Sequence, residues 1–178
     1  MNTTNFYVEL IVIGLGPFLC LVLVSSTLFA IDPATMIAFV SWGNFVMLLP
    51  IIYLLGIITD RGADALFDCC WESQMKKELS DDQRRAARCL ILTKGEKLAE
   101  LIEYGRSRMR MCRGWAFNCP LLMVAVAVYA LREGLDHSDL FLIELMLAVL
   151  AVAAWFSWRT LARSDYQKVK DSGKLLKT

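Results

Sequence analysis

Four stretches of the chain are almost purely apolar, and polar residues separate them. About 20 consecutive apolar residues suffice to cross a bilayer as a helix. We therefore predict four transmembrane helices, over Leu10–Ala30, Met36–Thr59, Gly114–Leu131 and Leu140–Trp158. The first stretch is not expected to be a cleaved signal peptide, because a signal peptide begins with a positively charged region and no Lys or Arg precedes Arg61.

A long charged insert, Asp60–Arg113, separates the second apolar stretch from the third. Two capping-box patterns within it, beginning at Ser80 and Thr93, predict helix starts. The insert should therefore hold three helical pieces, which run to about Leu79, over about Asp81–Leu92, and from about Lys94 into the membrane.

The predicted fold class is an all-α integral membrane protein with four transmembrane helices. Its second and third helices extend into a cytoplasmic helical hairpin, and the protein is expected to be oligomeric because one small bundle has little lumen of its own. The corresponding units are residues 1–59, 60–113, 114–158 and a basic tail, 159–178.

Basic residues are distributed unevenly along the chain. Of the 19 Lys and Arg residues, all except Arg132 lie in the insert or in the tail. Because basic residues collect on the cytoplasmic side of membrane proteins, we place the insert and both termini on the cytoplasmic side of a bacterial inner membrane. The turns near Asp32 and His137 then face outward. An apolar content of 57% and a mean hydropathy of +0.48 agree with a membrane protein.

The two ends of the insert carry matching charges at helical spacing. Acids recur at Asp60, Asp64, Asp68 and Glu72, and bases at Arg106, Arg110 and Arg113. Steps of three and four place each set on one helix face, and residues at equal heights on antiparallel helices should pair. The expected pairs are Asp60 with Arg113, Asp64 with Arg110, and Asp68 with Arg106.

This charge ladder has three interpretations. It could be a zipper that sets the register of the hairpin, a charged vestibule of an oligomeric pore, or a surface that docks a partner. In the zipper, exchanging the charges of Asp64 and Arg110 should restore what either single change loses.

Glu144 is an acidic residue inside the fourth apolar stretch. An acid within a bilayer is costly and marks a candidate functional site. Its candidate partners are Arg132 and the amide of Asn44. Either Glu144 reaches the headgroups near the outer surface, or it forms a proton or cation site.

The second and third apolar stretches each combine an asparagine with a proline, Asn44 with Pro50 and Asn118 with Pro120. Proline removes a backbone hydrogen bond, so we expect kinks at Pro50 and Pro120. The asparagines either line a pathway or bind helices together by hydrogen bonds.

The first apolar stretch carries an acid at its start and small residues within it. Glu9 lies at a helix N-terminus, where negative charge is favoured, and we expect Arg159 or Arg163 to pair with it. The expected helix-packing positions are Gly14, Gly16 and Ser25.

The chain shows no pattern for a cofactor, metal or catalytic centre. Its six cysteines form no C-x-x-C pair, and its single histidine, His137, lies in a short polar loop. Nucleophile-elbow, nucleotide-binding and metalloprotease motifs are missing. We therefore expect a protein that is not an enzyme and that binds no cofactor or metal.

The basic tail indicates contact with lipid. Polybasic cytoplasmic segments bind anionic headgroups. No aromatic residues are interleaved as in nucleic-acid-binding segments, so no direct nucleic-acid binding is expected. The lysines concerned are Lys168, Lys170, Lys174 and Lys177.

The overall layout of four apolar spans and a charged insert resembles that of small bacterial multi-pass components of anti-phage systems, such as the membrane subunit of the Kiwa system. This resemblance is one of architecture and implies no residue roles. We expect an oligomeric sensor or scaffold that couples a membrane event to a soluble cytoplasmic protein. The alternatives are an oligomeric ion channel or membrane-disrupting pore, and a membrane anchor of a redox or transport complex.

Overall fold

The computed structural model describes residues 3–29, 35, 42–67, 69, 96–134 and 136–175. Four long helices account for nearly all of them: α1 (Thr3–Phe29), α3 (Trp42–Phe67), α6 (Glu96–Glu133) and α7 (His137–Leu175). Each helix contains a stretch long and apolar enough to cross a membrane, which confirms the all-helical class and the four candidate spans. The helical pieces predicted between residues 70 and 95 lie outside the described residues.

α6 and α7 are each about twice as long as a bilayer requires. They have 38 and 39 residues. At 1.5 Å per residue each is about 57 Å long or slightly more, against about 30 Å for the hydrocarbon core. α6 begins at Glu96 and enters the predicted third span without a break, while α7 continues past Trp158 into the basic tail. Both helices therefore extend beyond their apolar spans.

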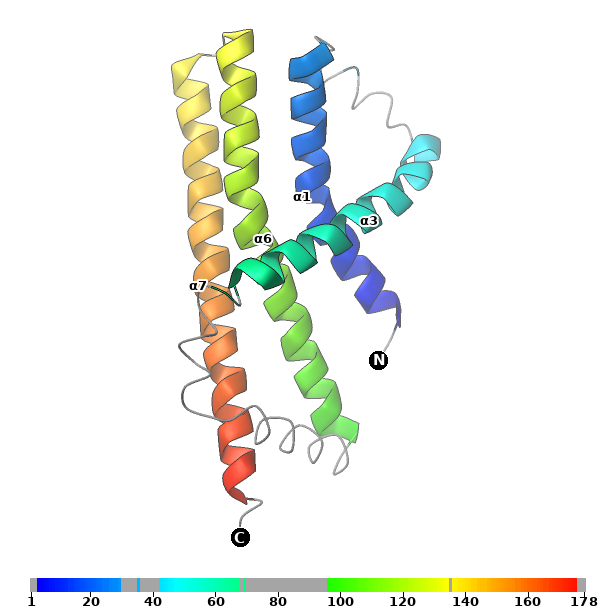
Figure 1. Cartoon of the computed structure of the whole chain (residues 1–178), viewed down its shortest axis with the longest axis vertical. Coiled ribbons are helices and arrows are strands. Elements are labelled where there is room, and N and C mark those ends of the chain that lie inside the picture. Colours follow the sequence, from blue (N-terminus) through cyan, green and yellow to red (C-terminus); the bar gives the residue numbers. More distant parts are fainter. Residues whose placement is uncertain are drawn as a thin grey trace.

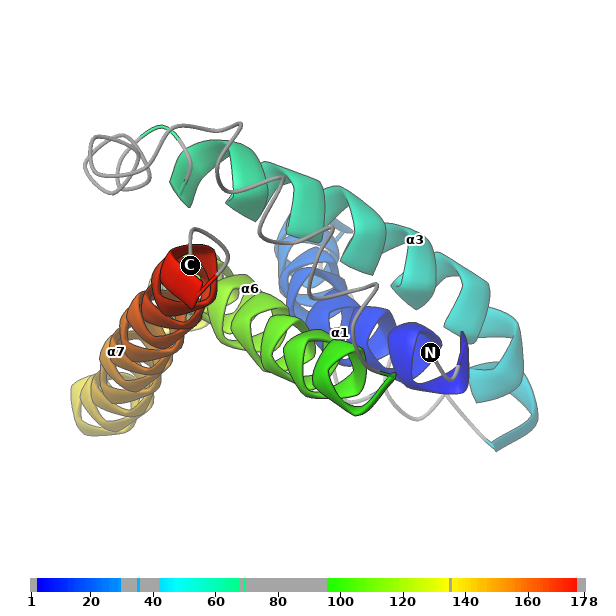
Figure 2. The same cartoon turned by 90° about the horizontal axis from the view of Figure 1, so that it is seen from below.

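α1, α6 and α7 lie side by side in a row, and α3 lies across one face of that row (Figure 1, Figure 2). α1 and α6 run in the same direction, and α7 returns antiparallel to α6. At the end of α6, the Gly134 N–H donates to the carbonyl oxygen of Ala130 at 3.0 Å. Gly134 has a φ of 68°, a left-handed conformation that suits glycine at a helix C-terminus.

α3 contacts the three helices of the row one after another along its length. Gly56 approaches α1, Asp60 accepts a hydrogen bond from α6, and Phe67 meets a tryptophan of α7. The rings of Phe67 and Trp158 stand edge to face with their centroids 4.6 Å apart. Within Trp42–Phe67, α3 therefore crosses α6 steeply instead of running beside it as an antiparallel neighbour (Figure 1).

The crossing of α1 and α3 depends on two glycines. A Cβ atom at Gly14 would overlap the carbonyl oxygen of Ile52 and lie 2.9 Å from the backbone nitrogen of Gly56. A Cβ atom at Gly56 would overlap the carbonyl oxygen of Leu10. Backbones can approach this closely only where both residues lack side chains. The packing role predicted for Gly14 is therefore confirmed.

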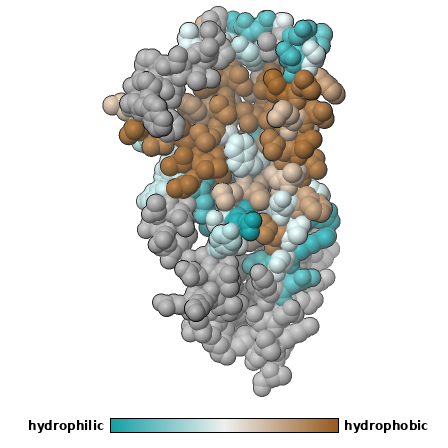
Figure 3. All heavy atoms as spheres, turned by 180° about the vertical axis from the view of Figure 1, so that it is seen from behind, coloured by the Kyte–Doolittle hydropathy of each residue, from teal (hydrophilic) through white to brown (hydrophobic). Residues whose placement is uncertain are grey.

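The buried core is narrow, and the surface around it is apolar. Core side chains include Ile13, Ile52 and Cys119, which have no exposed surface. Met47 and Leu131, in contrast, are 79% and 85% exposed. On the face opposite α3, apolar side chains form a band with hydrophilic residues at both ends (Figure 3). An exposed apolar surface of this extent is typical of a protein that contacts lipid.

Candidate functional site

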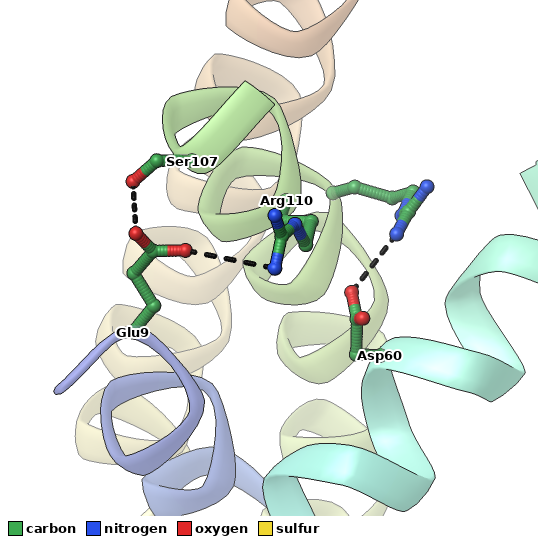
Figure 4. A network of polar contacts seen from close by, with 5 residues as sticks. Glu9, Asp60, Ser107 and Arg110 are labelled. Atoms are coloured by element: carbon green, nitrogen blue, oxygen red, sulfur yellow. Dashed lines mark hydrogen bonds and ion pairs between the residues drawn. The ribbon is translucent and has the colours of Figure 1, made fainter. Parts of the chain in front are cut away.

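A polar network joins α1, α3 and α6 near the start of α1. Its members are Glu9, Asp60, Asp64, Ser107, Arg110 and Arg113. The network lies where the charged sequence of α6 gives way to its apolar span, so it occupies one edge of the apolar region. Figure 4 shows Glu9 on one side of α6 and Asp60 on the other.

Arg113 connects α6 to α3 through two carboxylates. Its guanidinium Nη2 donates to Asp60 Oδ1 at 2.9 Å, and its Nη1 pairs with Asp64. Asp60 and Asp64 are one helical turn apart and therefore lie on the same face of α3. The predicted pair of Asp60 with Arg113 is present.

The predicted pair of Asp64 with Arg110 was wrong, because Asp64 pairs with Arg113 instead. A ladder needs two helices that rise together, whereas α3 crosses α6 steeply and meets it at one level. Asp68 and Glu72 lie outside the residues whose side chains are described, and Arg106 forms no ion pair among those residues.

Arg110 instead connects α6 to α1. Its Nη1 lies 4.0 Å from Glu9 Oε2, and its guanidinium carbon stands 5.0 Å from the centre of the Phe6 ring. The Ser107 hydroxyl donates to the other oxygen of Glu9 (Figure 4). The expectation that Arg159 or Arg163 pairs with Glu9 was therefore wrong. α1 lies beside α6, which presents Ser107 and Arg110 one turn apart on the face toward Glu9.

The network is buried enough for its charges to matter. Glu9 and Asp60 are only 7% and 8% exposed. Three carboxylates, of Glu9, Asp60 and Asp64, share two guanidinium groups. Removing one partner from a buried ion pair leaves an uncompensated charge, which is strongly destabilising. The network therefore fixes how the three helices sit against one another.

Asn118 holds α6 to α1 inside the apolar region. The residue is completely buried, and its side-chain Nδ2 donates to the backbone oxygen of Ile13 at 2.8 Å. Ile13 precedes Pro17 by four residues, and Pro17 has no N–H with which to satisfy that carbonyl within α1. Asn118 thus supplies the hydrogen bond that the proline removes. Its amide also fills the space beside Gly16, where a Cβ atom would lie 2.6 Å from Asn118 Cγ.

Glu144 lies within the apolar part of α7. It is half-buried, while its neighbours Ile143 and Leu145 are exposed. One of its carboxylate oxygens, Oε1, is buried and has no hydrogen-bond partner among the described residues. Of its two candidate partners, Arg132 is exposed, and the Asn44 side chain lies outside the described set.

The remaining candidate residues are placed only by their helices. Pro50 and Pro120 lie inside α3 and α6, and neither ends its helix. The lysines predicted to bind headgroups, Lys168, Lys170 and Lys174, belong to α7, while Lys177 lies outside the described residues. In the described part of the chain, no group of three or more His, Cys, Asp or Glu could hold a metal ion.

The fold and the network define a class of protein: an α-helical chain with four candidate membrane spans and a polar network at one edge of its apolar region. In comparisons with protein-family models, curated proteins and solved structures, nothing matches the chain.

Proposed function

We propose that this protein is a non-enzymatic, multi-pass membrane protein of the bacterial inner membrane that acts as an oligomeric sensor or scaffold. It couples an event in the membrane to a soluble cytoplasmic partner, and the architectural resemblance favours a role in anti-phage defence. The observation that carries the proposal is the polar network, because it ties three apolar helices together at the level from which α6 and α7 extend out of the apolar region.

Two physical properties support this coupling. A network of buried charges has few alternative arrangements, so a displacement of α3 in the membrane must either move α6 or break the bonds of Arg113. α6 and α7 are continuous helices through this level, so they carry such a displacement beyond the apolar region. Their charged extensions then offer a soluble protein a surface to bind.

The test is affinity purification of the full chain from its native host, in lipid nanodiscs. We expect a soluble protein to be captured, and its capture to be lost when Glu100→Lys and Glu103→Lys are combined at the polar end of α6. Arg132→Glu is the matched control, because it changes charge at the opposite end of the same helix. Recovery of no specific soluble protein, or equal loss with the control, would overturn the proposal.

An oligomeric ion channel or membrane-disrupting pore is the second candidate. The observation that favours it is the buried oxygen of Glu144 inside an apolar span, which has no hydrogen-bond partner among the described residues. Asn118 does not fit a pathway in this arrangement, because it is fully buried between α1 and α6 and bonded to Ile13. Ion flux through reconstituted liposomes tests this candidate. Flux that Glu144→Gln changes would support it, and liposomes that stay sealed would exclude it.

A further inference from the structure

α3 lies at an unusual inclination for an apolar helix of its length. Transmembrane helices generally tilt by about 0–40° from the bilayer normal. α3 has 26 residues, enough for about 39 Å, so it could stand upright across a bilayer. It instead crosses the row of α1, α6 and α7 steeply (Figure 1, Figure 2). Specific contacts must therefore hold it in the oblique position.

Those contacts divide α3 into a pivot and two arms. The pivot is the close approach of Gly14 and Gly56, where neither backbone carries a side chain that would lock the crossing angle. The arm before the pivot is apolar. Val46 and Met47, toward its far end, are 64% and 79% exposed, while Ile52 is fully buried and the ring of Tyr53 packs against that of Tyr7. The arm after it holds the bonds of Asp60 and Asp64 to Arg113, and ends at Phe67.

From this geometry we propose that α3 is a lever that responds to the thickness of the bilayer. A thicker apolar layer favours helices that are less tilted, and a thinner one favours more tilted helices. The oblique position shown here corresponds to the thinner layer. Rotation toward the upright brings the apolar arm closer to the row and carries Asp60 and Asp64 away from Arg113, because the two arms lie on opposite sides of Gly56.

The inference rests on the proposed function because it names the membrane event that the sensor detects. The bonds of Arg113 act as a latch that sets how much thickening is needed before α3 moves. When the latch opens, Phe67 at the end of α3 moves relative to α6 and α7. If α3 only stabilised the fold and did not move, it would keep the same inclination in every bilayer.

The size of the movement makes it measurable. Met47 lies about 13 Å along the helix axis from Gly56, so a rotation of about 30° displaces it by about 7 Å. Met47 and Met146 of α7 are both well exposed, so spin labels introduced there as noncanonical amino acids leave the packing and the native cysteines intact. Leu19 of α1 and Val149 of α7 are exposed positions for a control pair within the row.

The experiment measures both distances by double electron–electron resonance in nanodiscs of dimyristoleoyl, dioleoyl and dierucoyl phosphatidylcholine. We expect the distance from Met47 to Met146 to shorten by several ångströms as the lipid chains lengthen, and the control distance to stay constant. Arg113→Gln should shift the first distance toward the shorter value in the intermediate lipid.

An unchanged distance from Met47 to Met146 in all three lipids would overturn the lever, as would an equal change in the control pair. The lipid series uses the unaltered sequence outside the labels, so its result stands even if Arg113→Gln fails to fold. Partner capture is a separate measurement. If the distance changes with the lipid but no soluble protein is captured, this inference stands and the proposed function falls. If a soluble protein is captured but the distance does not change, the proposed function stands and this inference falls.

Discussion

The side-chain amide of Asn118 donates a hydrogen bond to the carbonyl oxygen of Ile13 in α1, which Pro17 deprives of its partner within the helix. Asn118 and Ile13 are 105 positions apart in the chain, and Asn118 Nδ2 lies 2.8 Å from the Ile13 carbonyl oxygen. Lipid offers no water to satisfy a freed carbonyl, so a broken helix in a membrane needs a donor from a neighbour. The proline of α1 and the asparagine of α6 are therefore one structural unit.

This unit makes a quantitative prediction. Pro17→Ala restores an N–H that can bond to Ile13 within α1, so the donor from Asn118 becomes redundant. We expect Asn118→Ala to lower the free energy of unfolding by about 1 kcal/mol more in the native background than in the Pro17→Ala background. Both backgrounds contain the same cavity, so the difference isolates the hydrogen bond. Denaturant unfolding in mixed micelles measures it, and equal losses would contradict the assignment.

Glycines at the crossing should behave differently from glycines on open faces. Gly14→Ala and Gly56→Ala each force the backbones of α1 and α3 apart, and we expect each to lower the free energy of unfolding by about 1–3 kcal/mol. A Cβ atom at Gly62 or Gly105 would meet no atom within 4 Å. Gly62→Ala and Gly105→Ala are therefore matched controls, and they should be neutral or stabilising because alanine favours a helix. Thermal unfolding in detergent compares the four variants.

The ion pair that holds α3 to α6 should be that of Asp60 and Arg113. Their side chains are 12% and 13% exposed, so Arg113→Ala strands a buried carboxylate and should cost roughly 3 kcal/mol of stability. A double-mutant cycle with Asp60→Ala should recover much of this loss, and exchange of the two charges should be partly tolerated.

The corresponding cycle of Asp64 with Arg110 serves as the control. These residues do not pair in the structure, because Asp64 bonds to Arg113 and Arg110 lies against Glu9. Their coupling energy should therefore be the smaller of the two. A larger coupling for Asp64 with Arg110 would restore the antiparallel ladder that the sequence suggested and refute the steep crossing.

Labelling can determine the orientation in the membrane. The uneven distribution of Lys and Arg predicts that Ser138, at the start of α7, faces away from the cytoplasm and that Ser164, further along the same helix, lies in it. In a background without native cysteines, Ser138→Cys in intact cells should react with a membrane-impermeant maleimide. Ser164→Cys should react only after the cells are opened, and the opposite pattern would invert the topology.

Hydropathy alone predicted the four candidate spans, because burial in lipid depends on the composition of each segment and not on its neighbours. The capping box at Thr93 also predicted that the helix of the third span begins in charged sequence. The partners of Asp64 and Glu9 were not predictable in this way. They depend on α3 crossing the row instead of running beside α6, and that crossing includes the close approach of Gly14 and Gly56, two residues from separate spans.

The role of Asn118 was only half visible in the sequence. Its two possible roles were a pathway and a hydrogen bond between helices, and nothing local distinguishes them. The missing signal was Pro17, which identifies the carbonyl of Ile13 as an acceptor in need of a donor. Which helix supplies that donor is a question of tertiary structure, because Asn118 reaches Ile13 only when α1 and α6 lie side by side.

The position of α3 across the row has a consequence for biogenesis. The ribosome makes α3 before it makes α6 and α7, the helices that receive its charged end. Until Arg113 emerges, Asp60 lacks the guanidinium group that it bonds in the finished structure, and an unpaired carboxylate is poorly tolerated in an apolar environment. The contact between α3 and α6 therefore cannot form until α6 has been made. Asp60 therefore acquires its final environment only after the second half of the chain has been made.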